Sequence, residues 1–364
     1  MASVIAALRR FLPRFLATSP PLSAAQRRAI AAIRQCRTPA LGGHLHACPD
    51  CKETRFAWHS CNHKACPQCG RAANALWVER QLAKLANAPY FLVTFTLPEE
   101  LRPLFFGTEA RESFHAFFAA ASQALADLLA SPRWLGIPVN GATAVLHTWN
   151  QKLLFHPHLH FIVPGVGLDV HGALRRVKNP NFLVPLPALR AAFKTAFRAA
   201  ISKPVEPAVW KKEWGIHIQP CGSGATAVKY LGAYVARTAV SDKRIVQVEN
   251  DHVLLLWKDR SQGGRQSLLR LDPIEFVRRY LRHVLPPRMH SVRYFGFCHP
   301  AAKKNRERVR FLSGMTLLLG SPPAALTSKP TQAPWTCPCC STPMQRQAKV
   351  GRATLSITRH EDDS

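Results

Sequence analysis

Two histidines in the middle of the chain have the spacing of a metal-binding pair. His158 and His160 lie in the segment HPHLHFIVP, which is expected to form a strand. Residues two apart on a strand point to the same face, so both imidazoles project together while Leu159 and Phe161 enter the core. Two adjacent imidazoles can hold one divalent cation. The pattern therefore predicts a metal site, the alternative being a polar strand face with two ordinary histidines.

Two tyrosines further along the chain could supply nucleophiles. Tyr230 and Tyr234 lie four residues apart in KYLGAYVAR, within an expected helix over 226–237. Residues four apart share one helix face, about 6 Å apart along the axis, so both phenols present together. Ordinary aromatic packing is the alternative. Lys229 and Arg237 flank the pair and suit phosphate, although solvated helix cations would look the same.

Cysteine pairs near the N-terminus have the spacing of a zinc ribbon. Cys48 and Cys51 form one CxxC pair, and Cys66 and Cys69 form another after 14 intervening residues. Four thiolates hold one tetrahedral zinc ion and leave no open position, so we expect a structural site. This use of the 11 cysteines indicates a reducing, intracellular compartment rather than a disulfide framework.

The remaining cysteines and histidines leave further sites open. A second zinc ion could use ligands from the same region, with Cys36, Cys61 and His63 as the main candidates and His44 and His46 also unassigned. The C-terminal run Cys337-Pro-Cys339-Cys340 looks like half of a further zinc site. Cys298 and His299 are candidates to complete it.

These side chains need a scaffold of mixed helices and strands. We expect helices over 22–34, with Ser23 as N-cap, and over 71–85, 109–129, 187–201, 226–237 and 274–284. Strands are expected over 90–96, 143–148, 158–163 and 216–219, and a hairpin over 244–248 and 253–257. Helices and strands follow one another along the chain without strict alternation, which predicts an α+β fold. We expect a central antiparallel sheet with helices on one face, joined to an N-terminal zinc ribbon with flanking helices.

Composition and motif placement divide the chain into four expected segments. Residues 1–88 form the N-terminal helices and zinc ribbon, and 89–262 hold the histidine and tyrosine motifs. Residues 263–318 form a basic helical extension, and 319–364 form a linker rich in proline followed by the cysteine tail.

The charge balance points to a polyanionic partner. Against 49 Lys and Arg stand 21 Asp and Glu, a formal net charge of +28, which excludes a generic acidic cytosolic enzyme. Nucleic acid is the first expectation and an anionic membrane surface the second. No apolar window is long enough for a spanning helix, and arginines interrupt residues 1–20, which favours a basic amphipathic lead-in segment over a secretory signal.

Basic side chains cluster after the hairpin. One group lies on the expected helix over 274–284, namely Arg278, Arg279 and Arg282. A second run follows, comprising Lys303, Lys304, Arg306, Arg308 and Arg310. Each group could serve solubility alone, but their concentration favours a track for DNA.

Taken together and in this order, the motifs resemble a known family. HPHLHFIVPG, YLGAYVART and the CPDC…CPQC ribbon resemble two-tyrosine transposases of rolling-circle insertion sequences, in the HUH superfamily. FTLPEEL, WKD and EFVRRYLRHVLP resemble further family segments, and the resemblance covers roughly residues 29–314. Family ribbons often carry a histidine directly before the first cysteine of the second pair, where this chain has Ala65.

The resemblance implies a DNA nuclease and strand transferase in the bacterial cytoplasm, associated with the nucleoid. Its RRM-like palm would bind Mg²⁺ or Mn²⁺ at His158 and His160, with Gln151 as the first choice of third ligand and His147 and His156 as competitors. Tyr230 or Tyr234 would attack single-stranded DNA to leave a 5′-phosphotyrosine, and the partners would be such strands and element-end hairpins. No membrane partner is expected, and the sequence does not determine the oligomeric state.

Three alternatives compete with this interpretation. A carboxylate-triad nuclease needs several convergent acids, yet residues 128–204 hold only Asp169. A zinc-ribbon DNA-binding regulator without enzymatic activity would explain the charge but not the histidines and tyrosines. A plasmid replication initiator or relaxase would share the chemistry and differ in biological output.

Overall fold

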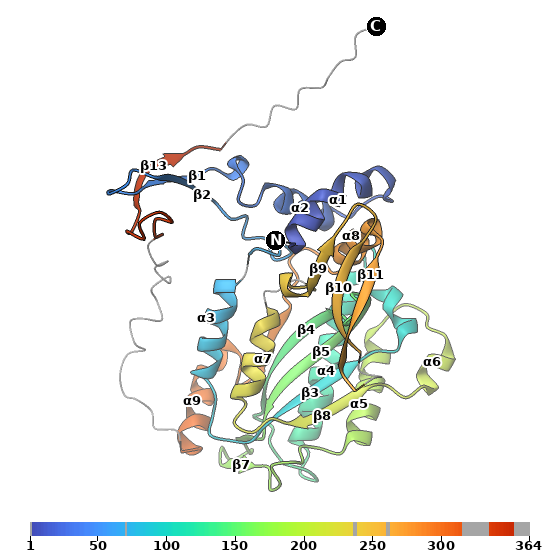
Figure 1. The fold of residues 1–364 in the computed structure, drawn as a ribbon. Coiled ribbons are helices and arrows are strands. Elements are labelled where there is room, and N and C mark those ends of the chain that lie inside the picture. Colours follow the sequence, from blue (N-terminus) through green and yellow to red (C-terminus); the bar gives the residue numbers. More distant parts are fainter. Residues whose placement is uncertain (1, 70, 236–238, 260–262, 315–334, 353–364) are drawn as a thin grey trace.

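A five-stranded antiparallel sheet forms the centre of the computed structural model (Figure 1). Its strand order is β12 (Val292–Gly296), β4 (Gly141–Trp149), β5 (Phe155–Pro164), β3 (Tyr90–Thr96) and β8 (Ile216–Pro220). The structure describes residues 2–69, 71–235, 239–259, 263–314 and 335–352.

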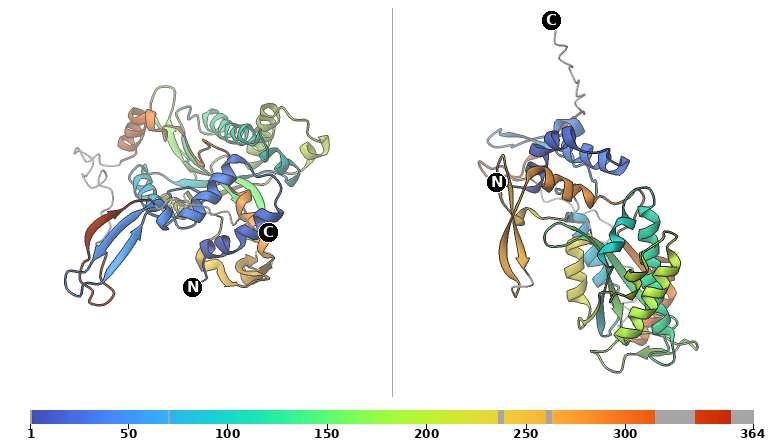
Figure 2. Two further views of the ribbon diagram at one scale, coloured as in Figure 1. Left: turned by 90° about the horizontal axis from the view of Figure 1, so that it is seen from above. Right: turned by 90° about the vertical axis from the view of Figure 1, so that its right-hand side faces the viewer.

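Helices cover both faces of this sheet (Figure 2, right). Helices α4 (Ala110–Ala130) and α5 (Leu186–Ala200) pack on one face, against the phenylalanine side chains of β3 and β5. Helices α3 (Arg71–Leu82), α7 (Ala225–Val235) and α9 (Lys303–Leu312) lie on the opposite face. The α+β class and the antiparallel sheet are confirmed, but helices on one face only are not observed.

The sheet sequence explains this double cover. Along β5, Leu159 and Phe161 enter the core beneath α4 and α5, while Ile162 packs with Val145 and Leu231 toward α7. Strands that are apolar on both sides must bury both faces, so each face recruits its own helices.

A second body forms above the sheet from segments far apart in sequence. It contains α1 (Val4–Thr18), α2 (Ala24–Gln35) and α8 (Pro273–Arg282), with Phe11, Ile33 and Phe276 in one buried cluster. The expected N-cap at Ser23 is confirmed, since its hydroxyl accepts from Gln26 N in a reciprocal capping box.

A three-stranded sheet joins this second body. The expected hairpin is present as β9 (Ile245–Val248) and β10 (Val253–Asp259), and β11 (Arg265–Leu271) adds a strand that was not predicted. Leu255 and Leu271 pack into the same core as α1 and α8.

A small sheet at one end of the molecule pairs a hairpin from the N-terminal part of the chain with a strand from its C-terminal part. β1 (Gly43–Ala47) pairs with β2 (Thr54–Trp58) on one edge and with β13 (Gln345–Val350) on the other. All three strands extend away from the central sheet (Figure 1).

Short elements complete the fold. They are η1 (Pro39–Leu41), η2 (Glu99–Phe105), β6 (Val166–Leu168), β7 (Leu174–Arg176), α6 (Pro207–Lys211), η3 (Asp242–Arg244) and η5 (Pro300–Ala302). Within the described ranges, no helix combines the length and apolar character needed to cross a bilayer.

Candidate metal and tyrosine site

Three histidines meet on the face of the sheet that α7 covers. His147 of β4 lies directly opposite His158 of β5, and His160 follows two residues along the same strand. One ring nitrogen from each lies within 4.8 Å of the others. The ring centroid of His147 is 5.3 Å from that of His158 and 4.7 Å from that of His160. The register of two paired strands therefore assembles the cluster.

Hydrogen bonds orient two of these rings. His158 Nδ1 lies 2.8 Å from the carbonyl oxygen of His156. Because a carbonyl only accepts, Nδ1 donates and the lone pair of His158 resides on Nε2. His160 Nδ1 lies 2.9 Å from Thr94 Oγ1 on β3. Such bonds to the nitrogen that does not ligate are the usual way proteins aim a metal-binding imidazole.

The third histidine is in the neutral form that binds metals. Burial, followed by the neighbouring His160 and His158, lowers the pKa of His147 well below its usual value. His147 is only 4% exposed and His160 only 8%. Three imidazoles on one face fit a divalent cation, which binds the neutral form of the ring.

The structure differs from the sequence-based ranking of the third ligand. Gln151 is exposed in the turn after β4, where its backbone carbonyl oxygen accepts a hydrogen bond from the guanidinium of Arg244. His156 Nδ1 lies 3.2 Å from the Arg102 guanidinium, outside the histidine cluster. The turn carries residue 151 past the strand end, whereas residue 147 still lies opposite His158. Pairing the two predicted strands as a hairpin could have identified His147.

Tyr230 approaches the cluster from α7. Its ring centroid is 6.4 Å from that of His160, with the rings nearly perpendicular at 87°. The side chain is 46% exposed, so a strand entering from solvent can reach the phenol. Tyr234 lies one turn later in α7, but its side chain is outside the described residues, as is Arg237. Lys229 is exposed beside Tyr230.

Two glycines set the position of α7. Gly224 precedes the helix with φ +81°, and a Cβ there would lie 2.6 Å from Tyr90 Cγ of β3. A Cβ on Gly232 would lie 2.0 Å from Val78 Cγ2 of α3. Both positions exclude a side chain. The helix that carries the tyrosines is therefore held against the sheet at one end and against α3 along its length.

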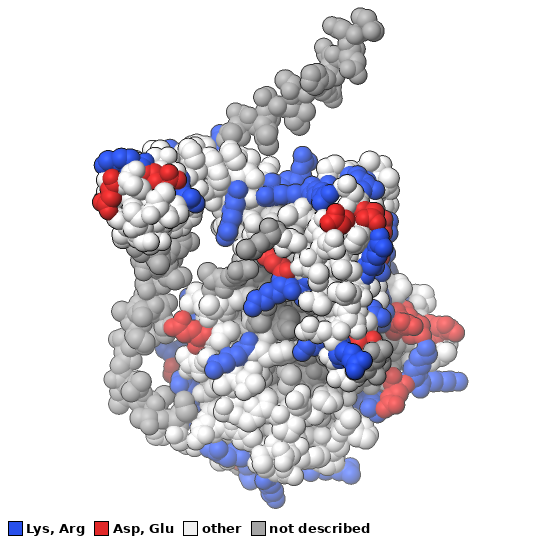
Figure 3. Space-filling model, in the orientation of Figure 1, with Lys and Arg blue, Asp and Glu red and all other residues white. Residues whose placement is uncertain are grey.

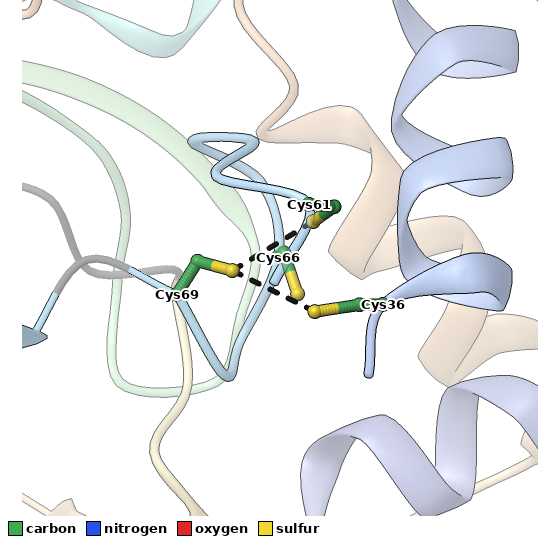
Figure 4. Close-up of side chains that lie close together, drawn as sticks. All are labelled: Cys36, Cys61, Cys66 and Cys69. Carbon is green, nitrogen blue, oxygen red and sulfur yellow. Dashed lines mark hydrogen bonds between the residues drawn. The ribbon is translucent and has the colours of Figure 1, made fainter. Parts of the chain in front are cut away.

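The predicted four-cysteine site is divided between two clusters, which corrects the sequence-based assignment. Cys66 and Cys69 lie with Cys36 and Cys61 in what we term the base cluster (Figure 4). Cys48 and Cys51 lie instead with Cys337 and Cys340, in the tip cluster. The physical reason is the β1–β2 hairpin. Each five-residue strand spans about 17 Å, which separates the turn carrying Cys48 and Cys51 from the hairpin base.

The base cluster fits structural zinc. Cys69 Sγ lies 3.6 Å from Cys36 Sγ and 3.7 Å from Cys61 Sγ. A zinc–sulfur bond of about 2.3 Å gives a tetrahedron with edges of about 3.8 Å. Cys36 and Cys66 are buried in the core shared with α1 and α8. His63 is not in the cluster, since its Nδ1 accepts from Ala65 N at 3.1 Å, so the expected set of Cys36, Cys61 and His63 holds only for the cysteines.

Cys298 and His299 do not complete the C-terminal cysteine run. Burial raises the pKa of the Cys298 thiol to about 12, and this side chain lines a small cavity with Lys84 and Arg306. His299 Nδ1 accepts from Ala301 N at 3.2 Å as the cap of η5. None of the 11 cysteines, all of which are in described segments, forms a disulfide.

Groups of basic side chains lie among uncharged surface in the upper part of the molecule, where α1, α2 and α8 lie (Figure 3). On α8, Glu275 forms ion pairs with Arg278 at 2.5 Å and Arg279 at 2.7 Å, which reduces their charge toward a ligand. Arg282 is exposed. Further exposed arginines lie on α1 and α2, namely Arg10, Arg14, Arg27, Arg28 and Arg34.

Comparison with protein families gives two matches. Residues 141–306 match a family described as "Putative transposase", and residues 7–97 match a "Transposase zinc-binding domain". The first range contains the three histidines and the tyrosine helix. The second contains the base cluster and half of the tip cluster.

Two relatives carry related descriptions. "Putative transposase y4qJ" of Sinorhizobium fredii is 37% identical over 351 residues, covering 90% of this chain and 86% of the relative. "Transposase for insertion sequence element IS801" of Pseudomonas savastanoi pv. phaseolicola is 29% identical over 289 residues, covering 72% and 67%. No solved structure matches.

Proposed function

This chain belongs to the IS91/IS801 family of transposases, and we propose its reaction on that basis. A transposase acts on DNA. The proposal is that this protein nicks and rejoins single-stranded DNA at element ends through a 5′-phosphotyrosine, as rolling-circle transposition requires. The observation that carries it is the phenol of Tyr230 beside a cluster of three histidines.

The reaction is a transesterification that keeps the energy of the phosphodiester bond. The Tyr230 phenol oxygen attacks phosphorus and forms a new P–O bond, and the bond from phosphorus to the 3′-oxygen breaks. The phenol loses one proton and the departing 3′-oxygen gains one. A 5′-phosphotyrosine and a free 3′-OH result, and attack by a 3′-OH on this ester reverses the step and rejoins the DNA.

The histidine cluster would hold a divalent ion at the scissile phosphate. His147, His158 and His160 would be its protein ligands. When bound, such an ion polarises the phosphate and stabilises negative charge that develops on its oxygens. Of the two ions expected, Mn²⁺ fits three imidazoles better than Mg²⁺, which prefers oxygen ligands.

Other side chains of the chain have supporting roles. Thr94 holds the His160 ring through Nδ1. Lys229 beside Tyr230 would neutralise a DNA phosphate, and the arginines of α1, α2 and α8 would hold the strand beyond the site. Tyr234 would provide a second nucleophile for the second strand end.

A replication initiator would use the same chemistry, but the family matches favour transposition. A regulator that only binds DNA leaves the three-histidine cluster and the adjacent tyrosine without a role. We therefore retain the transposase reaction as the function that the geometry supports best.

A labelled single-stranded oligonucleotide carrying the element end, run on a denaturing gel, tests the proposal. We expect a covalent adduct with Mn²⁺, and its loss when Tyr230→Phe and Tyr234→Phe are combined. Tyr294→Phe is the matched control. Tyr294 lies on β12, and its phenol oxygen accepts a hydrogen bond from Trp77 Nε1 of α3 at 2.9 Å rather than contacting the histidine cluster. An adduct that persists in the double variant, or cleavage that His158→Ala leaves unchanged, would contradict the mechanism.

A further inference from the structure

The tip cluster takes its thiols from both ends of the chain. Cys48 and Cys51 lie in the turn between β1 and β2, and Cys337 and Cys340 lie just before β13. We propose that these four cysteines bind a second zinc ion, and that this ion fastens the C-terminal tail, residues 335–352, to the N-terminal hairpin.

The sulfur positions match a tetrahedral thiolate site. Cys48 Sγ lies 3.4 Å from Cys340 Sγ, and Cys51 Sγ lies 3.4 Å from Cys337 Sγ and 3.7 Å from Cys340 Sγ. These separations are far longer than a disulfide of about 2.05 Å and close to the edge of about 3.8 Å expected around zinc. Each half contributes a CxxC pair, the usual unit of a structural zinc site.

Backbone geometry marks both halves as zinc knuckles. Among the described residues, six that are not glycine have positive φ, and four of them directly follow a cysteine of a cluster. These four are Arg37, Lys52, Asn62 and Ser341. Side-chain-bearing residues seldom adopt this conformation. Lys52 and Ser341 occupy equivalent positions after the second cysteine of each tip pair, at φ 62° and 61°. The residue after the second cysteine thus has the same backbone conformation in both tip pairs, and the residues after Cys36 and Cys61 in the base cluster also have positive φ.

The tail meets the hairpin along its length. β13 pairs antiparallel with β1, with Ala348 opposite Leu45. Trp335 stacks on His46 with ring centroids 5.5 Å apart, and Thr342 Oγ1 donates to Asp50 Oδ2 at 2.5 Å. The tail is therefore positioned by contacts other than the four thiols.

These contacts bury little apolar surface. The hydrophobic cluster here consists of Cys48, Cys337 and Met344, whereas the base cluster belongs to an extensive core. A unit with so small a core needs a metal or disulfide to hold its shape, and the thiols form no disulfide. A zinc ion is what this donor set selects.

The matched zinc-binding region supplies only part of this site. It covers residues 7–97, which hold all four base cysteines but only Cys48 and Cys51 of the tip. The remaining ligands, Cys337 and Cys340, come later in the sequence, after the segment that holds the histidine cluster and the tyrosine helix. A second zinc would therefore couple the two ends of the chain, independently of the DNA reaction.

Zinc content of the full chain tests this inference. The measurement uses elemental analysis of protein with His158→Ala and His160→Ala, so that the histidine cluster adds no zinc. We expect two zinc ions per chain, and one when Cys337→Ser and Cys340→Ser are added. Cys339→Ser is the matched control, because this exposed neighbour lies outside the cluster, and it should retain two. One zinc in the parent, two in the double serine variant, or loss in the control would each overturn the assignment.

Tail retention provides a second readout. A protease site inserted between Ala325 and Leu326 allows the tail to be cut from the folded chain. With zinc present, the cut tail should stay bound through gel filtration, and a chelator or the Cys337→Ser and Cys340→Ser changes should release it. Release in zinc, or retention by the serine variant, would contradict the proposal. Neither readout uses DNA cleavage, so failure here is distinct from failure of the transposase mechanism.

Discussion

The histidine cluster and the two cysteine clusters are assembled in different ways. The histidines lie within residues 147–160 on two adjacent strands, and the register of one β-hairpin brings them together. The base cysteines come from 36–69, and the tip cysteines from two segments more than 280 residues apart. A site built by local pairing can lose its function while the fold remains. A site whose side chains lie within a large hydrophobic core, as those of the base cluster do, also supports the fold.

The largest expected effect concerns the difference between the base and tip clusters. Cys66→Ser removes a buried thiol from the base cluster within the core formed by α1 and α8. We expect it to lower the melting temperature by about 10 °C or more, because loss of a structural metal releases the segments it joins. Cys340→Ser, in the small tip cluster, should shift the main transition by less than about 2 °C. Equal shifts in melting temperature for the two variants, measured by calorimetry, would contradict this difference between the clusters.

The second prediction separates the histidine site from the fold. Replacing both His158 and His160 by Ala should reduce DNA cleavage more than about 100-fold, because even partners that only orient a ligand cost 10–100-fold. The melting temperature should change far less than for Cys66→Ser. Single-turnover cleavage and calorimetry on the same preparation measure both. A large loss of stability would show that this site also supports the fold.

The third prediction sharpens the ligand set within the histidine site. His147→Ala should weaken Mn²⁺ binding by about 10–100-fold, since it removes one of three imidazoles. Gln151→Ala should leave the affinity unchanged, because Gln151 is exposed in the turn beyond the strand. Titration of Mn²⁺ followed by electron paramagnetic resonance compares the two. An equal effect of both substitutions would restore Gln151 as a ligand.

The smallest expected effect tests how β3 supports the site. Thr94→Val keeps the shape of the side chain and removes the hydroxyl that contacts His160 Nδ1. We expect a loss of about 10-fold in Mn²⁺ affinity, with the fold intact. Thr143→Val is the control. Thr143 lies on β4 two residues before Val145, on the same face of the sheet as His147. A comparable loss in the control would indicate a general effect on the sheet.

Sequence patterns predicted the local parts of the site and of the fold. The period of two in the HPHLH segment placed His158 and His160 on one face, and the spacing of four placed both tyrosines on α7. The helices and strands that were expected lie close to their observed bounds, although several observed elements, among them α9, β11 and β12, were not expected. Both results follow from backbone periodicity, which is a property of neighbouring residues.

The parts of the candidate sites that sequence patterns did not predict depend on which segments pair. The spacing of two CxxC pairs suggested one zinc ribbon, but the hairpin length keeps Cys51 and Cys66 apart. Nothing in the local sequence of Cys337 and Cys340 indicates that Cys48 and Cys51 are their neighbours. Gln151 was ranked above His147 because the family resemblance implies an amide or carboxylate ligand there. The strand register that places His147 opposite His158 is a property of the folded sheet.

The order of strands in the small sheet affects how the chain is made. β1 lies in the middle of the order β13-β1-β2, yet its neighbour β13 starts only at Gln345 and is translated after all the strands of the central sheet. Until residues 345–350 have left the ribosome, one edge of β1 has no strand to pair with, and an unpaired edge can recruit a strand from another chain. A copy truncated by a stop codon before β13 would keep the central sheet and the base cluster, but one edge of β1 would stay unpaired. This edge of β1 is therefore closed only in a chain that contains β13.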